Sequence, residues 1–209
     1  MSQDNMQQVQ KRLNQYWYVD GITEIGFGFL CLTLGFYFYI IEHLDESSLL
    51  FKLLPIGFVL VILGSAFGIN RFVSYLKNRI TYPRTGFVAY RQVRSYWRFL
   101  IGALVGLMSA ALSIMISRLP VSIDWMPLIT GVMFTLVSLY IAYRIGLWRY
   151  VIIAILTFIL GIYLSLEAGG NYAGLFTFYL VLGSALSAIG IIILGRYVIS
   201  NQPPTEELE

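Results

Sequence analysis

The run Ala173–Gly195, AGLFTFYLVLGSALSAIGIIILG, contains no charged residue. It is longer than the roughly 20 apolar residues that an α-helix needs to cross the hydrocarbon core of a bilayer. Its apolar residues are continuous rather than alternating, which is typical of a spanning helix and not of a membrane β-strand. Because a helix satisfies its own backbone hydrogen bonds in lipid, this run predicts a transmembrane helix.

Further apolar runs of similar length lie upstream, and the composition agrees with a membrane protein. The chain is 58% hydrophobic and 12% charged, with a mean hydropathy of +0.74, whereas soluble domains carry about 25% charged residues. We therefore predict an all-α integral membrane protein, a bundle of six transmembrane helices. The other five predicted spans are Ile22–Ile41, Leu49–Ile69, Phe99–Ser117, Met126–Tyr143 and Tyr150–Leu166.

The distribution of basic residues predicts the orientation. If the N-terminus is cytoplasmic, the outer connections hold only Lys52 and Arg118 as basic residues, and the cytoplasmic connections hold all the others. Cytoplasmic loops are enriched in Lys and Arg, so both termini are expected in the cytoplasm of a cell that carries the chain in its plasma or inner membrane. The cytoplasmic residues are Lys11, Arg12, Arg71, Lys77, Arg79, Arg84, Arg91, Arg94, Arg98, Arg144, Arg149 and Arg196.

The segment before the first span has an amphipathic pattern. Met6, Val9, Leu13 and Trp17 recur at a spacing of three or four, with Gln, Lys and Arg between them, which predicts an N-terminal helix lying in the membrane interface. The resulting organisation is an interfacial helix over residues 1–21, spans within 22–69, a basic cytoplasmic loop over 70–98, spans within 99–195 and an acidic tail over 196–209.

The cytoplasmic loop over residues 70–98 is basic and contains no acidic residue. Tyr82–Gly86, YPRTG, has the Pro and Gly spacing of a turn, and the β-branched and aromatic flanks Ile80–Tyr82 and Phe87–Tyr90 could pair as a short hairpin. The loop could contact anionic lipid headgroups, dock a protein partner, or bind a phosphorylated or carboxylated small ligand. Nucleic acid is not expected, since lipid phosphates already lie beside these charges.

This loop also carries a resemblance. The run Arg79–Val88, RITYPRTGFV, resembles a segment of uncharacterised prokaryotic multi-pass membrane proteins, which place a similar Tyr-Pro-Arg-x-Gly run in a cytoplasmic loop. The resemblance covers about ten residues. It implies a prokaryotic plasma membrane and no particular activity.

Two carboxylates stand at the start of the first span. Asp20 precedes it, and Glu24 lies about one helical turn inside it, where a charge is costly unless it is paired. We expect Asp20 or Glu24 to pair with an arginine of the loop, which would hold the loop under the bundle. The candidate arginines are Arg79, Arg84, Arg91 and Arg94.

Small residues at a spacing of four predict where helices approach closely. They occur in the second, third and sixth spans, where packing within the bundle and packing against a second chain both remain open. The candidate packing residues are Gly64, Gly68, Gly102, Gly106 and Gly183.

Residues that carry catalysis are not evident in the sequence. His43 is the sole histidine and Cys31 the sole cysteine, so a histidine triad inside the bundle and bis-histidine haem ligation are not expected. Cys31 lies in an apolar run and is expected to be a small buried hydrophobe. We assign no catalytic, cofactor or metal residues.

The first functional hypothesis is a non-catalytic accessory or scaffold protein that binds a membrane or cytoplasmic partner, or a second copy of itself. The second is a small permease or channel, alone or as the membrane subunit of a transporter. A membrane enzyme ranks third, since neither a nucleophile nor an acid–base pair is apparent.

Overall fold

The computed structural model describes residues 18–45, 47–85, 123–167 and 172–201. Within these ranges every regular element is helical, and five helices are long and apolar enough to cross a membrane. The five are α2 (Ile22–Glu42), α3 (Leu49–Leu76), α6 (Met126–Ile145), α7 (Trp148–Glu167) and α8 (Ala173–Ser200).

These helices confirm five of the six predicted spans. The third predicted span, over residues 99–117, lies outside the described residues, as do residues 1–17 of the predicted interfacial helix and residues 202–209 of the predicted tail. Residues 18–21 form a turn ahead of α2. The all-helical membrane class is therefore established, whereas the sixth span and the interfacial helix stay predictions.

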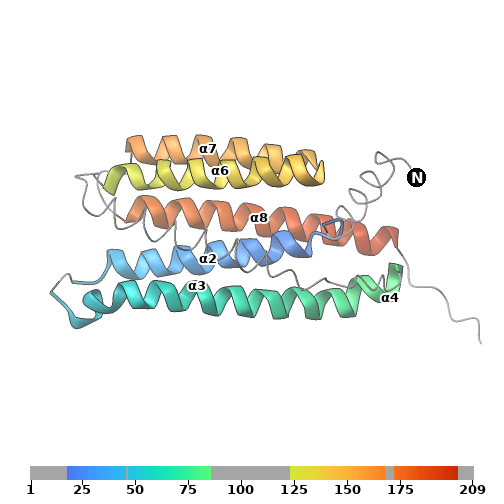
Figure 1. Ribbon diagram of the computed structural model, residues 1–209, viewed down its shortest axis with the longest axis horizontal. Helices are drawn as coiled ribbons and strands as arrows, with labels where there is room; N and C mark the ends of the chain where they lie inside the picture. Colours follow the sequence, from blue (N-terminus) through green and yellow to red (C-terminus); the bar gives the residue numbers. More distant parts are fainter. Residues whose placement is uncertain (1–17, 46, 86–122, 168–171, 202–209) are drawn as a thin grey trace, which may run out of the picture.

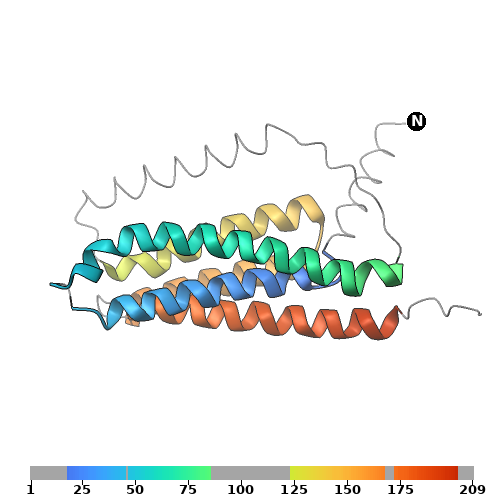
Figure 2. The same cartoon turned by 90° about the horizontal axis from the view of Figure 1, so that it is seen from below.

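The five helices run roughly parallel to one another, and α2 lies between α3 and α8 in both views (Figures 1 and 2). The most extensive packing joins α2 to α8 and α6 to α7, and α3 packs against α2. By contrast, α7 and α8 touch each other over a limited surface. The described bundle thus consists of the α6–α7 hairpin beside a layer of three helices.

Glycines permit the two closest pairings. A Cβ atom on Gly183 of α8 would lie 2.9 Å from the carbonyl oxygen of Gly28 on α2, and one on Gly131 of α6 would lie 2.8 Å from the carbonyl oxygen of Thr157 on α7. A real Cβ essentially never approaches backbone so closely, so these helices can touch only where side chains are missing. Close backbone approach is how membrane helices gain van der Waals contact without a hydrophobic driving force.

The connection between α6 and α7 is a tight turn, and it lies in the gap between the predicted spans Met126–Tyr143 and Tyr150–Leu166. Gly146 adopts φ +76°, and its N–H donates a 2.7 Å hydrogen bond to the carbonyl of Ala142. Glycine reaches this left-handed conformation without steric cost, which ends the helix. The turn places Arg144 and Arg149 at the same end of the bundle.

The predicted loop boundary at residue 70 is corrected by the structure. Helix α3 runs on to Leu76 and continues as a π-helix, η1 (Lys77–Thr81), and a short helix, α4 (Tyr82–Thr85). The predicted strand over residues 80–82 is therefore wrong, and its expected partner, residues 87–90, lies outside the described residues. Tertiary contacts override the local β propensity, because Val73, Lys77 and Thr81 recur at a spacing of four and are all buried.

The described chain ends meet at one end of the bundle. Gly21, ahead of α2, would place a Cβ 2.6 Å from the carbonyl oxygen of Gly190 on α8. The starts of α2 and α7 and the ends of α3, α6 and α8 therefore lie together, on the side of Figure 1 where α4 is labelled. We call this end the basic end, because it carries Lys77, Arg79, Arg84, Arg144, Arg149 and Arg196.

Candidate functional site

A group of buried and half-buried polar side chains joins three elements at the basic end. It lies where α2 begins, between η1 on one side and the first turn of α7 on the other. We call it the polar cluster, and it consists of Asp20, Glu24, Lys77, Thr81, Arg149 and Tyr150.

Asp20 fixes α2 to the end of α3. Its Oδ2 lies 3.2 Å from Nζ of Lys77 and accepts a 3.0 Å hydrogen bond from the hydroxyl of Thr81, while its Oδ1 accepts one from the N–H of Ile22. Asp20 and Lys77 are each 1% exposed. A buried charge must be paired and hydrogen-bonded to be tolerated, and these contacts meet that requirement.

Glu24 fixes α2 to the start of α7. Its Oε1 lies 2.7 Å from Nη2 of Arg149 and accepts a 2.6 Å hydrogen bond from the hydroxyl of Tyr150. The same Nη2 donates to the backbone carbonyl of Tyr18, and the Tyr18 ring packs edge-on against that of Tyr150. Burial, followed by the charge of Glu24, raises the pKa of the Tyr18 hydroxyl above its ordinary value.

The polar cluster is electrically balanced. Two carboxylates face two cations, and each carboxylate has its own cation at contact distance. Of the described residues in and beside the cluster, three carry a buried polar atom without a hydrogen-bond partner: Oγ1 of Thr23, Oε2 of Glu24 and Nε of Arg149. The arrangement suits a structural clamp, because the charges that could attract a ligand or move a proton are already engaged with one another.

The structure brings together the predicted carboxylates but not the predicted arginines. Asp20 and Glu24 are buried and paired as charges, but their cations are Lys77 and Arg149, neither of which the sequence singled out for this role. Arg79 donates a 2.6 Å hydrogen bond to the hydroxyl of Tyr75 on an exposed part of α3. Arg84 is half-buried on α4, while Arg91 and Arg94 lie outside the described residues.

The predicted packing glycines divide into two groups. Gly183 lies against Gly28 and Leu32 of α2, as expected. A Cβ added to Gly64 or Gly68 of α3 would meet no described atom within 4 Å, so these two glycines serve no packing inside the described part of the bundle. Gly102 and Gly106 lie outside the described residues.

The described residues hold no group of three or more His, Cys, Asp or Glu side chains that could bind a metal ion. The His43 ring contacts the Tyr39 ring at a tilt of 40°, with 4.3 Å between ring centroids, and its Nδ1 lies 2.9 Å from the carbonyl oxygen of Tyr39. Cys31 is 0% exposed and packs in the apolar core, as expected. These two residues therefore play structural parts at the end and in the centre of α2.

The five long apolar helices define the chain as a multi-pass helical membrane protein. No family model, curated protein or solved structure matches it. Its function must therefore be argued from the surfaces and contacts of the described helices.

Proposed function

We propose that the chain is a non-catalytic accessory subunit that binds a transmembrane helix of another protein chain through the outer face of α3. The observation that carries this proposal is the open surroundings of Gly64 and Gly68. In the apolar window of α3 only 6% of the residues are buried, against 39% for α2. Among the five long helices α3 is the one least enclosed by the bundle.

The outer face of α3 has the shape of a helix-docking surface. Leu60, Gly64, Phe67 and Gly68 follow one another at spacings that place them on one side of the helix. Leu60 is 64% exposed and Phe67 67%. Small-xxx-small faces of this kind let a second membrane helix approach closely.

The polar cluster supports a non-catalytic role. Its carboxylates are held by Lys77 and Arg149, so they brace α2 against α3 and α7 instead of facing an open site. A braced bundle can present the α3 face in a fixed orientation, which lowers the entropy lost on association.

The positive-inside rule supports placing the basic end in the cytoplasm of a plasma membrane. The opposite end of the described bundle carries acidic side chains, namely Glu42, Asp45, Asp124 and Glu167. With this orientation both described chain ends face the cytoplasm.

Photo-crosslinking in native membranes tests the proposed face, because a photoreactive ketone bonds to C–H groups and needs no thiol on the partner. p-Benzoylphenylalanine in place of Phe67 is the probe, and the same residue in place of Ile191 on α8 is the matched control, because both native side chains are more than half exposed. Illumination is expected to join the α3 variant, but not the control, to a second chain in fixed stoichiometry. A product at twice the mass of the 23.7 kDa chain would identify that partner as a second copy.

Two results would contradict the proposal. One is an α3 photoprobe that gives no crosslinked product after illumination. The other is crosslinking of that probe within its own chain, to residues 99–117, since that would assign the face to packing inside the bundle. Gly64→Ile with Gly68→Ile should also abolish the complex while Gly195→Ile retains it.

A further inference from the structure

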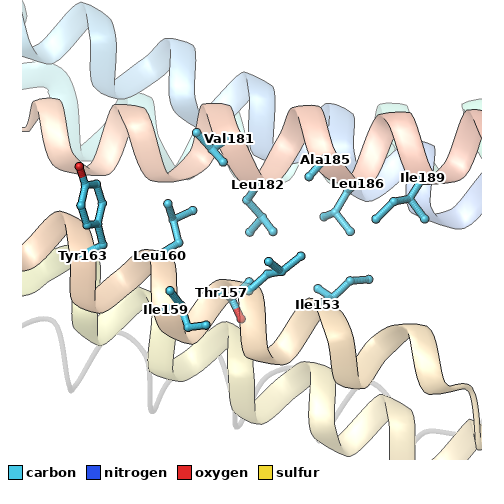
Figure 3. Close-up of a pocket in the computed structure, with 11 residues that line it drawn as sticks. Ile153, Thr157, Ile159, Leu160, Tyr163, Val181, Leu182, Ala185, Leu186 and Ile189 are labelled. Carbon is cyan, nitrogen blue, oxygen red and sulfur yellow. The ribbon is translucent and has the colours of Figure 1, made fainter.

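A groove of about 290 Å³ runs between α7 and α8, where these two helices separate (Figure 3). Its floor is buried: Thr157 is 0% exposed, Leu182 4% and Leu186 6%. Its rim is open to the outside of the bundle, and Leu156, Ile159 and Val181 are about half exposed. The groove therefore opens sideways, toward the lipid.

The groove is lined almost entirely by hydrocarbon side chains, and its buried hydroxyl is already hydrogen-bonded. Thr157 contributes a hydroxyl, but that hydroxyl already donates to the carbonyl of Ala154 at 2.9 Å and lies 3.1 Å from the hydroxyl of Thr135 on α6. Tyr163 carries the other side-chain hydroxyl of the lining, and it is hydrogen-bonded to Glu167. A flexible hydrocarbon chain fits such a surface better than a polar solute does.

The groove lies near the middle of both α7 and α8 and is about half as long as a bilayer core is thick. Along α7 its lining extends from Ile153 to Tyr163, which is about 15 Å of helix at 1.5 Å per residue and so about half of a ~30 Å hydrocarbon core. On α8 it ends at Ile189, toward the basic end. An acyl chain that enters the groove from the basic end would have its headgroup beyond Ile189.

A cation stands where that headgroup would be. Arg196 is seven residues, or almost two helical turns, beyond Ile189, so it lies on the same side of α8 about 10 Å closer to the helix end. It is exposed and makes no ion pair with any residue that the structure describes. Arg149, the corresponding cation on α7, is engaged by Glu24, which leaves Arg196 available to a phosphate.

We propose that the α7–α8 groove binds one acyl chain of an anionic glycerophospholipid whose phosphate contacts Arg196. The buried apolar floor binds the chain, and the guanidinium selects the negative headgroup through charge-assisted hydrogen bonds. This lipid site is independent of the proposed function, because it lies on α7 and α8 and does not involve the outer face of α3.

Native mass spectrometry of the full chain from micelles doped with phosphatidylglycerol or phosphatidylcholine tests the site. The wild type is expected to retain one phosphatidylglycerol in preference to phosphatidylcholine. Arg196→Gln should lower phosphatidylglycerol occupancy about fivefold, as expected for loss of one arginine beside an anionic headgroup. Arg144→Gln, which removes another exposed arginine at the same end, should leave it unchanged.

A second pair of variants tests the groove itself. Ala185 lines it, so Ala185→Phe should fill it and reduce retention of both lipids, whereas Ala188→Phe places the same ring on a neighbouring exposed face of α8. Equal loss with both phenylalanine variants, equal retention of the two lipids by the wild type, or an Arg196→Gln chain that still prefers phosphatidylglycerol would each overturn the proposal.

Discussion

Lys77 and Asp20 are both almost fully buried at the basic end, and neither charge would be stable there alone. Their separation of 3.2 Å gives each the counter-ion that its lost hydration requires. Thr81 adds a hydrogen bond to the carboxylate. The pair thus ties the end of α3 to the start of α2 through electrostatics that depend on both partners.

Lys77→Met should therefore destabilise the bundle strongly. The variant leaves Asp20 buried without its cation, and breaking a buried pair in this way costs about 3–5 kcal/mol. The measurement is the thermal unfolding midpoint in detergent. The double variant Asp20→Asn with Lys77→Met removes both charges and should recover most of the loss; a double variant as unstable as the single one would mean that packing, not charge pairing, holds this site.

The sequence identifies the carboxylates that need partners but not which cations supply them. Asp20 and Glu24 stand out because charge at the start of an apolar run is unusual, and that signal is local. The choice of Lys77 over Arg79 depends on α3 continuing as a helix beyond residue 70, since this continuation places residues 73, 77 and 81 on the buried side. The pairing of Arg149 with Glu24 requires the α6–α7 turn to lie beside α2. This contact depends on how the helices pack, which the local sequence pattern does not give.

Helix pairs show the same division between local and tertiary signals. Hydropathy and length identify α2, α3, α6, α7 and α8, because lipid requires long apolar helices whatever their neighbours. Small-residue spacing marks Gly64, Gly68 and Gly183 alike, yet only Gly183 meets a helix within the described residues. Small-residue spacing indicates that another helix can approach closely at that face. Which helix does so depends on how the whole bundle packs.

Gly183→Ala should separate α2 from α8. The added Cβ would lie 2.9 Å from backbone atoms of Gly28 and Leu32, and overpacking of this kind typically costs about 1–3 kcal/mol. The readout is again the unfolding midpoint in detergent. Gly195→Ala on the same helix meets nothing within 4 Å among the described residues and should leave the midpoint unchanged; equal effects of both variants would refute the packing role of Gly183.

At the scale of the whole molecule, the two ends of the bundle impose a constraint on the chain path. Helix α4 ends at the basic end, whereas α6 begins at the opposite end and returns to the basic end at Ile145. The span predicted over residues 99–117 would join these two ends with a single crossing.

Membrane orientation can be tested with one cysteine at each end. Ser200 ends α8 at the basic end, and Ser47 precedes α3 at the opposite end; both are exposed, and the native Cys31 is buried. A membrane-impermeant maleimide should label Ser47→Cys in intact cells and Ser200→Cys only after permeabilisation, because basic ends face the cytoplasm. The reverse pattern would invert the proposed topology and leave the fold intact.

The contact between Glu24 and Tyr150 joins residues 126 positions apart. A ribosome feeding this chain into a membrane delivers α2 long before the first turn of α7 exists. Until then Glu24 has no guanidinium to meet and must keep its hydration near the lipid headgroups. The pairing of α2 with α7 is consequently a late step in biogenesis. A nascent chain that ends before α7 should leave α2 without this ion pair and open to quality-control proteases.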